Sequence, residues 1–175
     1  GVQTCALPIS ISLIWEMVKN GDSVYRDFVY ALMNHKTELL SEILTEVAYT
    51  SMSYFDTGKG PAERTPENFY HGLVLGLIVS LRDQYRIVSN RESGMGRYDI
   101  AMYPLQKDLD AFILEFKVMN ENKEKEIEDT ARNALLQIEE KAYETDLLAA
   151  GIPREKIYKL GIAFVGKNAL VMEQQ

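Results

Sequence analysis

Apolar residues in the first part of the chain recur every three or four positions, the spacing of helices with one buried face. This pattern predicts helices over 11–19, 23–33 and 36–51. A nearly continuous apolar run predicts a further, buried helix from 65 to about 82, with Thr65 at its N-cap and a proline at its first position. The first half of the chain is therefore predicted to be helical.

Shorter runs rich in β-branched and aromatic residues follow, and these predict strands. We place the strands at 85–90, 98–102, 111–118, 157–165 and, at an edge, 169–172. A charged run between the third and fourth strands opens a long helix from 120 to about 150, which Gly151 ends. The order of helix, three strands, helix and strand predicts an α/β fold with a mixed central sheet flanked by helices.

The strand at 111–118 carries two charges in an otherwise apolar run. Residues two apart on a strand share a face, so the even-numbered positions form a fully apolar face. The odd-numbered positions begin apolar but end with Glu115 and Lys117. Because desolvating unpaired charges is costly, this acid and lysine predict a functional role rather than a structural one.

The strand at 98–102 places a second acid, Asp99, near its start. If these two strands pair as neighbours, Asp99 lies beside Glu115. Two carboxylates and the backbone carbonyl of Phe116 form a hard oxygen site suited to Mg²⁺. Lys117 on the same face would orient or activate a water and stabilise charge that develops on a phosphate.

This arrangement resembles the PD-(D/E)XK nuclease superfamily, with Asp99 as the first acid and Glu115-Phe116-Lys117 as the E-x-K element. Further segments that are similar to one branch of this superfamily are 66–72, 89–94, 96–99, 137–141 and 161–164. In that branch the nuclease-like domain is the C-terminal part of bacterial proteins that begin with a predicted AAA-type ATPase domain. The resemblance covers roughly Tyr54 to the end, and it implies a restriction-endonuclease-like αβββαβ core behind an N-terminal helical segment.

The resemblance also suggests roles for residues on the flanking helices. Glu67 lies in the first turn of its helix, where it either interacts favourably with the helix N-terminus or joins the metal site. His71, one turn later, is either structural or a phosphate contact. Gln137 in the long helix corresponds to a glutamine of related nucleases. In those nucleases a tyrosine stands four residues later and helps to position the site or the DNA. Here that position is Lys141, and the nearest tyrosine is Tyr143.

Composition narrows the classes of protein that the chain can belong to. The formal net charge of −7 argues against a protein that coats nucleic acid, but not against a nuclease, whose metal site itself needs acids. One cysteine and two histidines exclude a disulfide framework and a zinc site of the usual type, which fits a reducing cytoplasm. The longest apolar run, 72–81, is too short to span a bilayer.

The chain is expected to divide into three parts. Residues 1–10 resemble the translation of a sequencing adapter, so we expect them to be non-native. Residues 11–58 are expected to be a helical connector from a missing upstream ATPase-like region, and 59–175 the nuclease-like domain. No Walker A motif is present in this chain, so it is not itself the ATPase.

Three functional interpretations remain open. The first is a Mg²⁺-dependent DNA nuclease domain, with Mn²⁺ as an alternative ion, that hydrolyses phosphodiester bonds and has DNA and the upstream ATPase domain as partners. The second is a catalytically silent module that binds nucleic acid or regulates the ATPase domain. The third is a fragment that is inert alone because its missing N-terminal half supplies an essential surface.

Overall fold

The computed structural model describes residues 23–53, 67–93 and 96–175. The helix predicted over 11–19, the adapter-like segment before it and the loop predicted at 56–65 lie outside the described residues.

Helices and strands follow the predicted order along the chain. The helices are α2 (Ser23–Met33), α3 (Thr37–Ser53), α4 (Glu67–Ile78), α5 (Ile127–Glu140) and α6 (Thr145–Ala149), with short 3-10 turns η1 (Val79–Asp83) and η2 (Arg154–Lys156). The strands are β1 (Tyr85–Ser93), β2 (Gly96–Pro104), β3 (Ala111–Val118), β4 (Ile157–Val165) and β5 (Asn168–Gln174). None of the helices in this described part is both long and apolar enough to cross a membrane.

The five strands form one mixed sheet in the order β1-β2-β3-β4-β5. Neighbouring strands are antiparallel except β3 and β4, which run parallel. A parallel pair needs a crossover connection, and α5 and α6 lie in that connection. The predicted mixed α/β fold with its αβββαβ order is confirmed.

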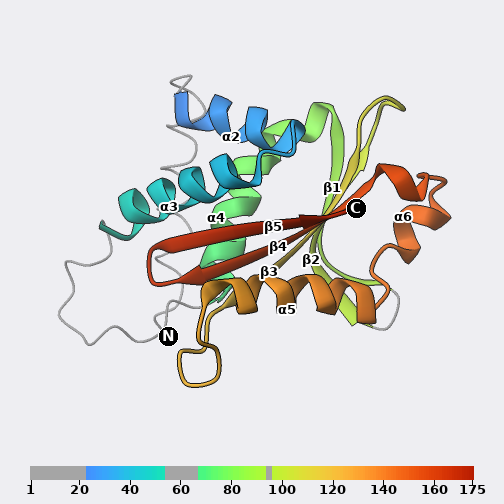
Figure 1. Cartoon of the computed structure of the whole chain (residues 1–175). Helices are drawn as coiled ribbons and strands as arrows, with labels where there is room; N and C mark the ends of the chain where they lie inside the picture. The colour runs from blue at the N-terminus through green and yellow to red at the C-terminus, as the bar shows by residue number, and fades with distance from the viewer. Residues whose placement is uncertain (1–22, 54–66, 94–95) are drawn as a thin grey trace, which may run out of the picture.

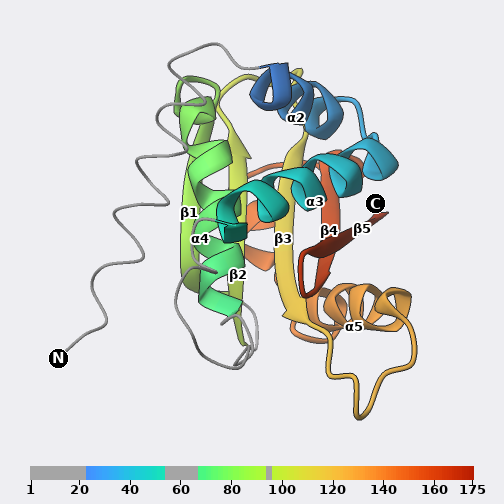
Figure 2. The same ribbon diagram turned by 90° about the vertical axis from the view of Figure 1, so that its left-hand side faces the viewer.

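Helices cover both faces of the sheet (Figures 1 and 2). Helices α2, α3 and α4 pack on one side, here called the α3 face, and α5 and α6 pack on the other, the α5 face. Strand β3 contributes to both cores as its alternation predicts: Phe112, Leu114 and Phe116 join the cluster on the α3 face, while Ala111 and Ile113 join the cluster on the α5 face. The charged residues near the end of β3, Glu115 and Lys117, therefore belong to the α5 side of the sheet.

Helix α3 also covers the outer edge of strand β5. The backbone N–H groups of Ala169 and Val171 donate to the hydroxyls of Thr45 (3.0 Å) and Ser41 (2.9 Å). An edge strand otherwise presents unpaired backbone groups that can recruit another chain. Two side chains of α3 thus replace the missing neighbouring strand.

The single long helix predicted from 120 to 150 is wrong, because the structure has two helices there. Helix α5 ends at Glu140 and α6 begins at Thr145, and between them Ala142 has a φ of 51°. Alanine has the highest helix propensity of all residues, so local preference does not explain this break. Tertiary contacts hold the turn instead, among them the burial of Tyr143, which is 2% exposed.

The charged run before α5 forms a loop rather than the first turns of that helix. Glu124 holds it: one carboxylate oxygen accepts from the Asn120 N–H and the Thr130 hydroxyl, both at 2.9 Å, and the other accepts from the Asn133 amide at 2.9 Å. Burial raises the pKa of Glu124, but these hydrogen bonds outweigh burial and hold the pKa below its usual value. Two of these donors, Thr130 and Asn133, belong to α5, so Glu124 joins the loop to the first turns of that helix.

Candidate active site

Asp99 and Glu115 hold opposite positions just past the last pair of β2 with β3, where the two acids lie on neighbouring strands. The register of these strands ends with Ile100 opposite Leu114, so Asp99 and Glu115 occupy the next position on each strand. There the Asp99 carboxylate accepts a hydrogen bond from the backbone N–H of Phe116 at 2.8 Å. A side chain, rather than the β2 backbone, therefore satisfies this amide, and the two predicted acids lie on neighbouring strands as expected.

The predicted helix residue Gln137 joins both charged residues of the E-x-K triplet. Its side-chain nitrogen donates to a carboxylate oxygen of Glu115, which is only 3% exposed. Its side-chain oxygen accepts from the ammonium of Lys117 at 2.6 Å. Buried polar groups need such partners, and one amide serves the acid and the lysine together. The structure thus brings Glu115, Lys117 and Gln137 into one bridge, called here the amide bridge.

Tyr143 extends the amide bridge, although its position in the sequence did not place it there. The Gln137 nitrogen donates to its hydroxyl at 3.2 Å, and its ring meets Tyr98 edge to face with 6.0 Å between ring centroids. On a continuous helix, a residue six positions after Gln137 would lie about 240° around the axis. The left-handed turn at Ala142 redirects the chain. Lys141, which stands at the expected tyrosine position, donates its backbone N–H to the Gln137 carbonyl at 3.0 Å.

A glycine on β4 lets α5 approach close enough for this bridge. Gly161 pairs directly with Glu115 across the β3–β4 ladder. A Cβ atom built on Gly161 would lie 2.4 Å from the carbonyl oxygen of Ala131 and 2.9 Å from Leu135 Cγ, both in α5. Any other residue would therefore push α5 outward, and with it the Gln137 side chain.

The environment of Asp99 disfavours its charged form in the absence of a cation. Burial raises the pKa of this carboxyl, while the hydrogen bond from the Phe116 N–H and electrostatic interactions with His71 and Lys117 lower it. The net shift is upward, so desolvation is the stronger effect. A cation bound beside Asp99 would stabilise the carboxylate and offset that desolvation.

The oxygen atoms at this site match the chemistry of a hard divalent cation. The carboxylates of Asp99 and Glu115 and the carbonyl of Phe116 are the donor types that Mg²⁺ prefers, and this ion commonly takes only one or two protein carboxylates and keeps several waters. Within the described residues, no cluster of three or more histidine, cysteine, aspartate and glutamate side chains could hold a metal. Glu67 was the candidate third acid, and its side chain lies outside the described residues.

His71 lies on the other side of β3 from the amide bridge. It is 9% exposed, its Nε2 atom is 2.9 Å from the Ser89 hydroxyl, and its ring stacks on Phe116 with 5.7 Å between centroids. These contacts place His71 behind the E-x-K strand, on the helix that begins at Glu67. Its predicted contact with phosphate stays a prediction.

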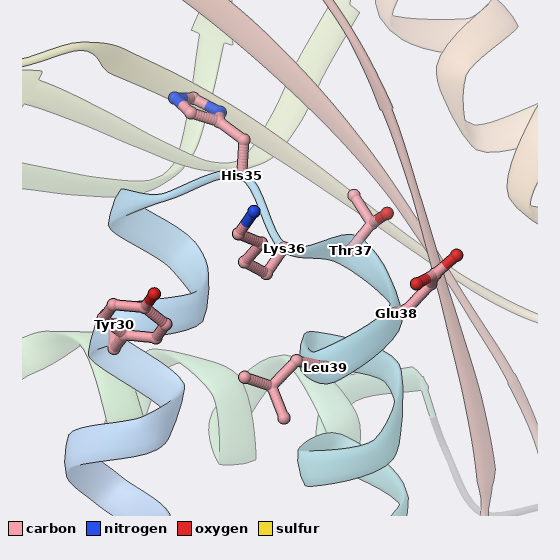
Figure 3. Close-up of a pocket in the computed structure, with 6 residues that line it drawn as sticks. All are labelled: Tyr30, His35, Lys36, Thr37, Glu38 and Leu39. Carbon is pink, nitrogen blue, oxygen red and sulfur yellow. The ribbon is translucent and has the colours of Figure 1, made fainter.

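The turn between α2 and α3 borders a hollow that is separate from the acids. The hollow has a volume of about 480 Å³ and is lined by Tyr30, His35, Lys36, Thr37, Glu38 and Leu39 (Figure 3). None of these residues is a predicted site residue. His35 instead joins the turn to the sheet, because its ring nitrogens contact Glu173 at 2.8 Å and Asp110 at 3.4 Å.

Comparison with known proteins assigns the family. A family model described as the PD-(D/E)XK nuclease superfamily matches residues 65–174. No curated protein and no solved structure matches the chain. The matched range contains α4, the whole sheet, α5 and α6, and therefore Asp99, the E-x-K triplet and Gln137. The chain accordingly belongs to the PD-(D/E)XK nuclease superfamily.

Proposed function

We propose that this domain is a Mg²⁺-dependent nuclease that hydrolyses the phosphodiester bonds of DNA. The observation that carries the proposal is the amide bridge, in which Gln137 contacts both Glu115 and Lys117 beside Asp99. Membership of the superfamily supports nuclease activity. The two neighbouring carboxylates support the choice of Mg²⁺, with Mn²⁺ as the alternative ion.

Each residue of the site would have a separate task in this reaction. Mg²⁺, when bound by Asp99, Glu115 and the Phe116 carbonyl, would supply Lewis acidity at the phosphate. Lys117 would orient the attacking water and stabilise the negative charge that develops on the phosphate oxygens. Gln137 would hold the ammonium and the Glu115 carboxylate in a fixed relation, so that little reorganisation is needed during the reaction.

Cleavage of plasmid and linear DNA in the presence of Mg²⁺ tests this proposal. Wild type should cleave, whereas Lys117→Ala and Asp99→Ala should not, because one lacks the ammonium and the other a metal ligand. Lys36→Ala, at an exposed lysine on the α2–α3 turn, is the matched control and should cleave as wild type does. Equal cleavage by wild type and both site variants would reject the mechanism.

The acidic balance of the chain favours a second candidate function, a silent module that binds nucleic acid or regulates a partner without cutting. Its net charge is −7, and phosphate backbones bind basic surfaces most strongly. DNA binding that changes neither on addition of Mg²⁺ nor in Glu115→Gln would support this candidate. Mg²⁺-dependent cleavage would exclude it.

We also propose that the domain works in the bacterial cytoplasm next to an ATPase domain of the same polypeptide. The ordered segments that resemble one branch of the superfamily support this context. The native sequence upstream of residue 11 provides the test. A G-x-x-x-x-G-K-[ST] motif there would support the two-domain arrangement, and a complete native sequence without an ATPase signature would contradict it.

A further inference from the structure

A buried lysine on the α5 face is not used by the proposed reaction. Lys159 of β4 is 4% exposed and pairs with Ile113 in the β3–β4 ladder, two residues before the pair of Glu115 and Gly161. It therefore lies on the same face of the sheet as Glu115, one step further from the acids. A buried ammonium needs charged partners, and the identity of these partners suggests a task.

The partners of Lys159 stand on either side of the turn between α5 and α6. Its ammonium forms an ion pair with Glu139, near the end of α5, and a second with Glu144 at 3.0 Å. Glu144 is only 13% exposed in its side chain and also pairs with the guanidinium of Arg154. One cation of the sheet thus holds both ends of the segment 140–143.

That segment carries the tyrosine of the amide bridge. Ala142 adopts the left-handed conformation there, with a φ of 51°, which is unfavourable for a residue with a Cβ atom. The turn places the hydroxyl of Tyr143 at 3.2 Å from the Gln137 nitrogen. A turn that opposes local preference depends on tertiary contacts, and the two ion pairs of Lys159 join both ends of this turn to the sheet.

We propose that Lys159 is a positioning residue for the active site. Its ion pairs with Glu139 and Glu144 hold the turn so that Tyr143 stays against Gln137, and Gln137 in turn fixes Glu115 and Lys117. The kinetic consequence rests on the proposed nuclease function, but the structural consequence does not. The tests below separate the two.

Hydrogen exchange at the turn tests the structural part without requiring cleavage. Lys159→Met removes the charge, retains most of the volume and leaves Glu144 paired with Arg154. Arg154→Met is the matched control, because it removes an exposed cation from the same carboxylate. The amide of Tyr143, which donates to the Ile138 carbonyl at 3.2 Å, should exchange about tenfold faster in Lys159→Met than in wild type. Arg154→Met should match wild type.

Equal protection of this amide in wild type and Lys159→Met would overturn the proposal. If Lys159→Met does not fold, Glu144→Gln replaces it in the experiment. That variant weakens the ion pair with Lys159 by changing its partly exposed partner. Faster exchange confined to the turn supports positioning. Protection retained at the turn in Glu144→Gln counts against it.

A double-mutant cycle with Tyr143→Phe tests the kinetic part. Lys159→Met should lower kcat for DNA cleavage about tenfold, with KM nearly unchanged, because the ground-state contacts with DNA are not altered. Added to Tyr143→Phe, it should lower kcat no further, since the two residues act in one chain of contacts. Losses that multiply would overturn the proposal. A wild type that does not cleave DNA would instead reject the nuclease function, and hydrogen exchange alone would then decide the role of Lys159.

Discussion

The two faces of the sheet differ in how their apolar clusters relate to polar residues. On the α3 face, aromatic and aliphatic side chains from α2, α3 and α4 form one continuous apolar cluster with the strands. On the α5 face, a smaller apolar cluster lies next to buried or partly buried polar residues, namely Glu115, Lys117, Gln137, Tyr143 and Lys159. Apolar contacts are non-directional, whereas charges and amides need particular partners. The comparison suggests that the α3 face chiefly stabilises the domain and the α5 face chiefly orients its chemistry.

Strand β3 shows how one short segment serves both purposes. Phe112 and Phe116 are 1% and 0% exposed and pack toward the α3 face, while Glu115 between them is equally buried, at 3%, toward α5. The apolar residues hold the strand at a fixed depth. That fixed depth sets the position of the intervening carboxylate, so the proposed metal ligand is oriented by its neighbours on the opposite face.

Among the variants that leave Asp99, Glu115 and Lys117 in place, removing the amide of Gln137 should have the largest effect, and it acts on the α5 face. Gln137→Leu leaves Glu115 and Lys117 without their shared partner, so DNA cleavage should fall about 10³-fold, which corresponds to about 4 kcal/mol of activation free energy. Single-turnover cleavage rates measure this loss. Gln106→Leu, at an exposed glutamine between β2 and β3, is the control. A rate within a few-fold of wild type would refute the role given to the amide bridge.

A cavity on the α3 face should instead affect stability and leave chemistry almost unchanged. Leu44 of α3 is 1% exposed within the large cluster, so Leu44→Ala should lower the free energy of unfolding by about 3 kcal/mol. The kcat of the folded enzyme should change less than twofold. Leu136→Ala serves as the matched control, because that leucine of α5 is 54% exposed. Urea unfolding and cleavage rates together test the comparison, and a large loss of kcat in Leu44→Ala would break it.

Gly161→Ala should affect both properties, because this glycine sits where α5 meets the sheet. The new methyl group would lie 2.4 Å from the Ala131 carbonyl, and displacing α5 should reduce the free energy of unfolding by about 2 kcal/mol. It should also move Gln137 away from Glu115 and slow cleavage. Thermal unfolding and cleavage assays measure the two effects.

Gly72→Ala is the control for Gly161→Ala. A Cβ atom at Gly72 meets nothing within 4 Å, and the residue lies inside helix α4, where alanine is favoured over glycine by about 0.5–1 kcal/mol. The control should therefore be neutral or stabilising. If both variants behave alike, close packing at Gly161 does not set the position of α5.

The repeating patterns of the sequence allowed most of the sheet to be predicted. The limits of β4, the alternation along β3 and the opposite positions of Asp99 and Glu115 on neighbouring strands all follow from a period of two residues and from strand order. These features depend on which strands are neighbours in the sheet, and the order of the elements along the chain indicates those neighbours. Sequence reasoning could therefore place the two acids on neighbouring strands, with Lys117 on the same strand as Glu115.

The turn that delivers Tyr143 could not be predicted in the same way. Its residues favour a helix, and the tertiary contacts at this turn include the buried Tyr143 ring and two ion pairs from Lys159, on a distant strand. The hydrogen bonds from β5 to Ser41 and Thr45 were equally hard to predict, because they join residues more than 100 positions apart. Neither contact leaves a periodic signal, because each rests on single side chains that meet only once the sheet has formed.

A buried hydroxyl on the α3 face gives the smallest expected effect and sharpens the contrast between the faces. Burial, and then the negative charges of Asp110 and Asp108, raise the pKa of Tyr85 from 10.0 to about 12. Because the folded state holds this proton more tightly than the unfolded state, Tyr85 contributes stability below about pH 10 that is lost as the pH rises toward about 12. Tyr85→Phe cannot ionise, so its stability should fall less than that of wild type over this window.

Urea unfolding at about pH 8 and about pH 11 measures the difference. At the lower pH, Tyr85→Phe should be nearly as stable as wild type, because it loses only a weak hydrogen bond to the Met33 sulfur at 3.4 Å. At the higher pH it should be the more stable of the two. The control is Tyr30→Phe, which removes a hydroxyl from a ring that is 55% exposed. An identical alkaline loss in Tyr85→Phe and wild type would mean that this hydroxyl is not part of the desolvated core, and that the α3 face is more open to water than its apolar contacts imply.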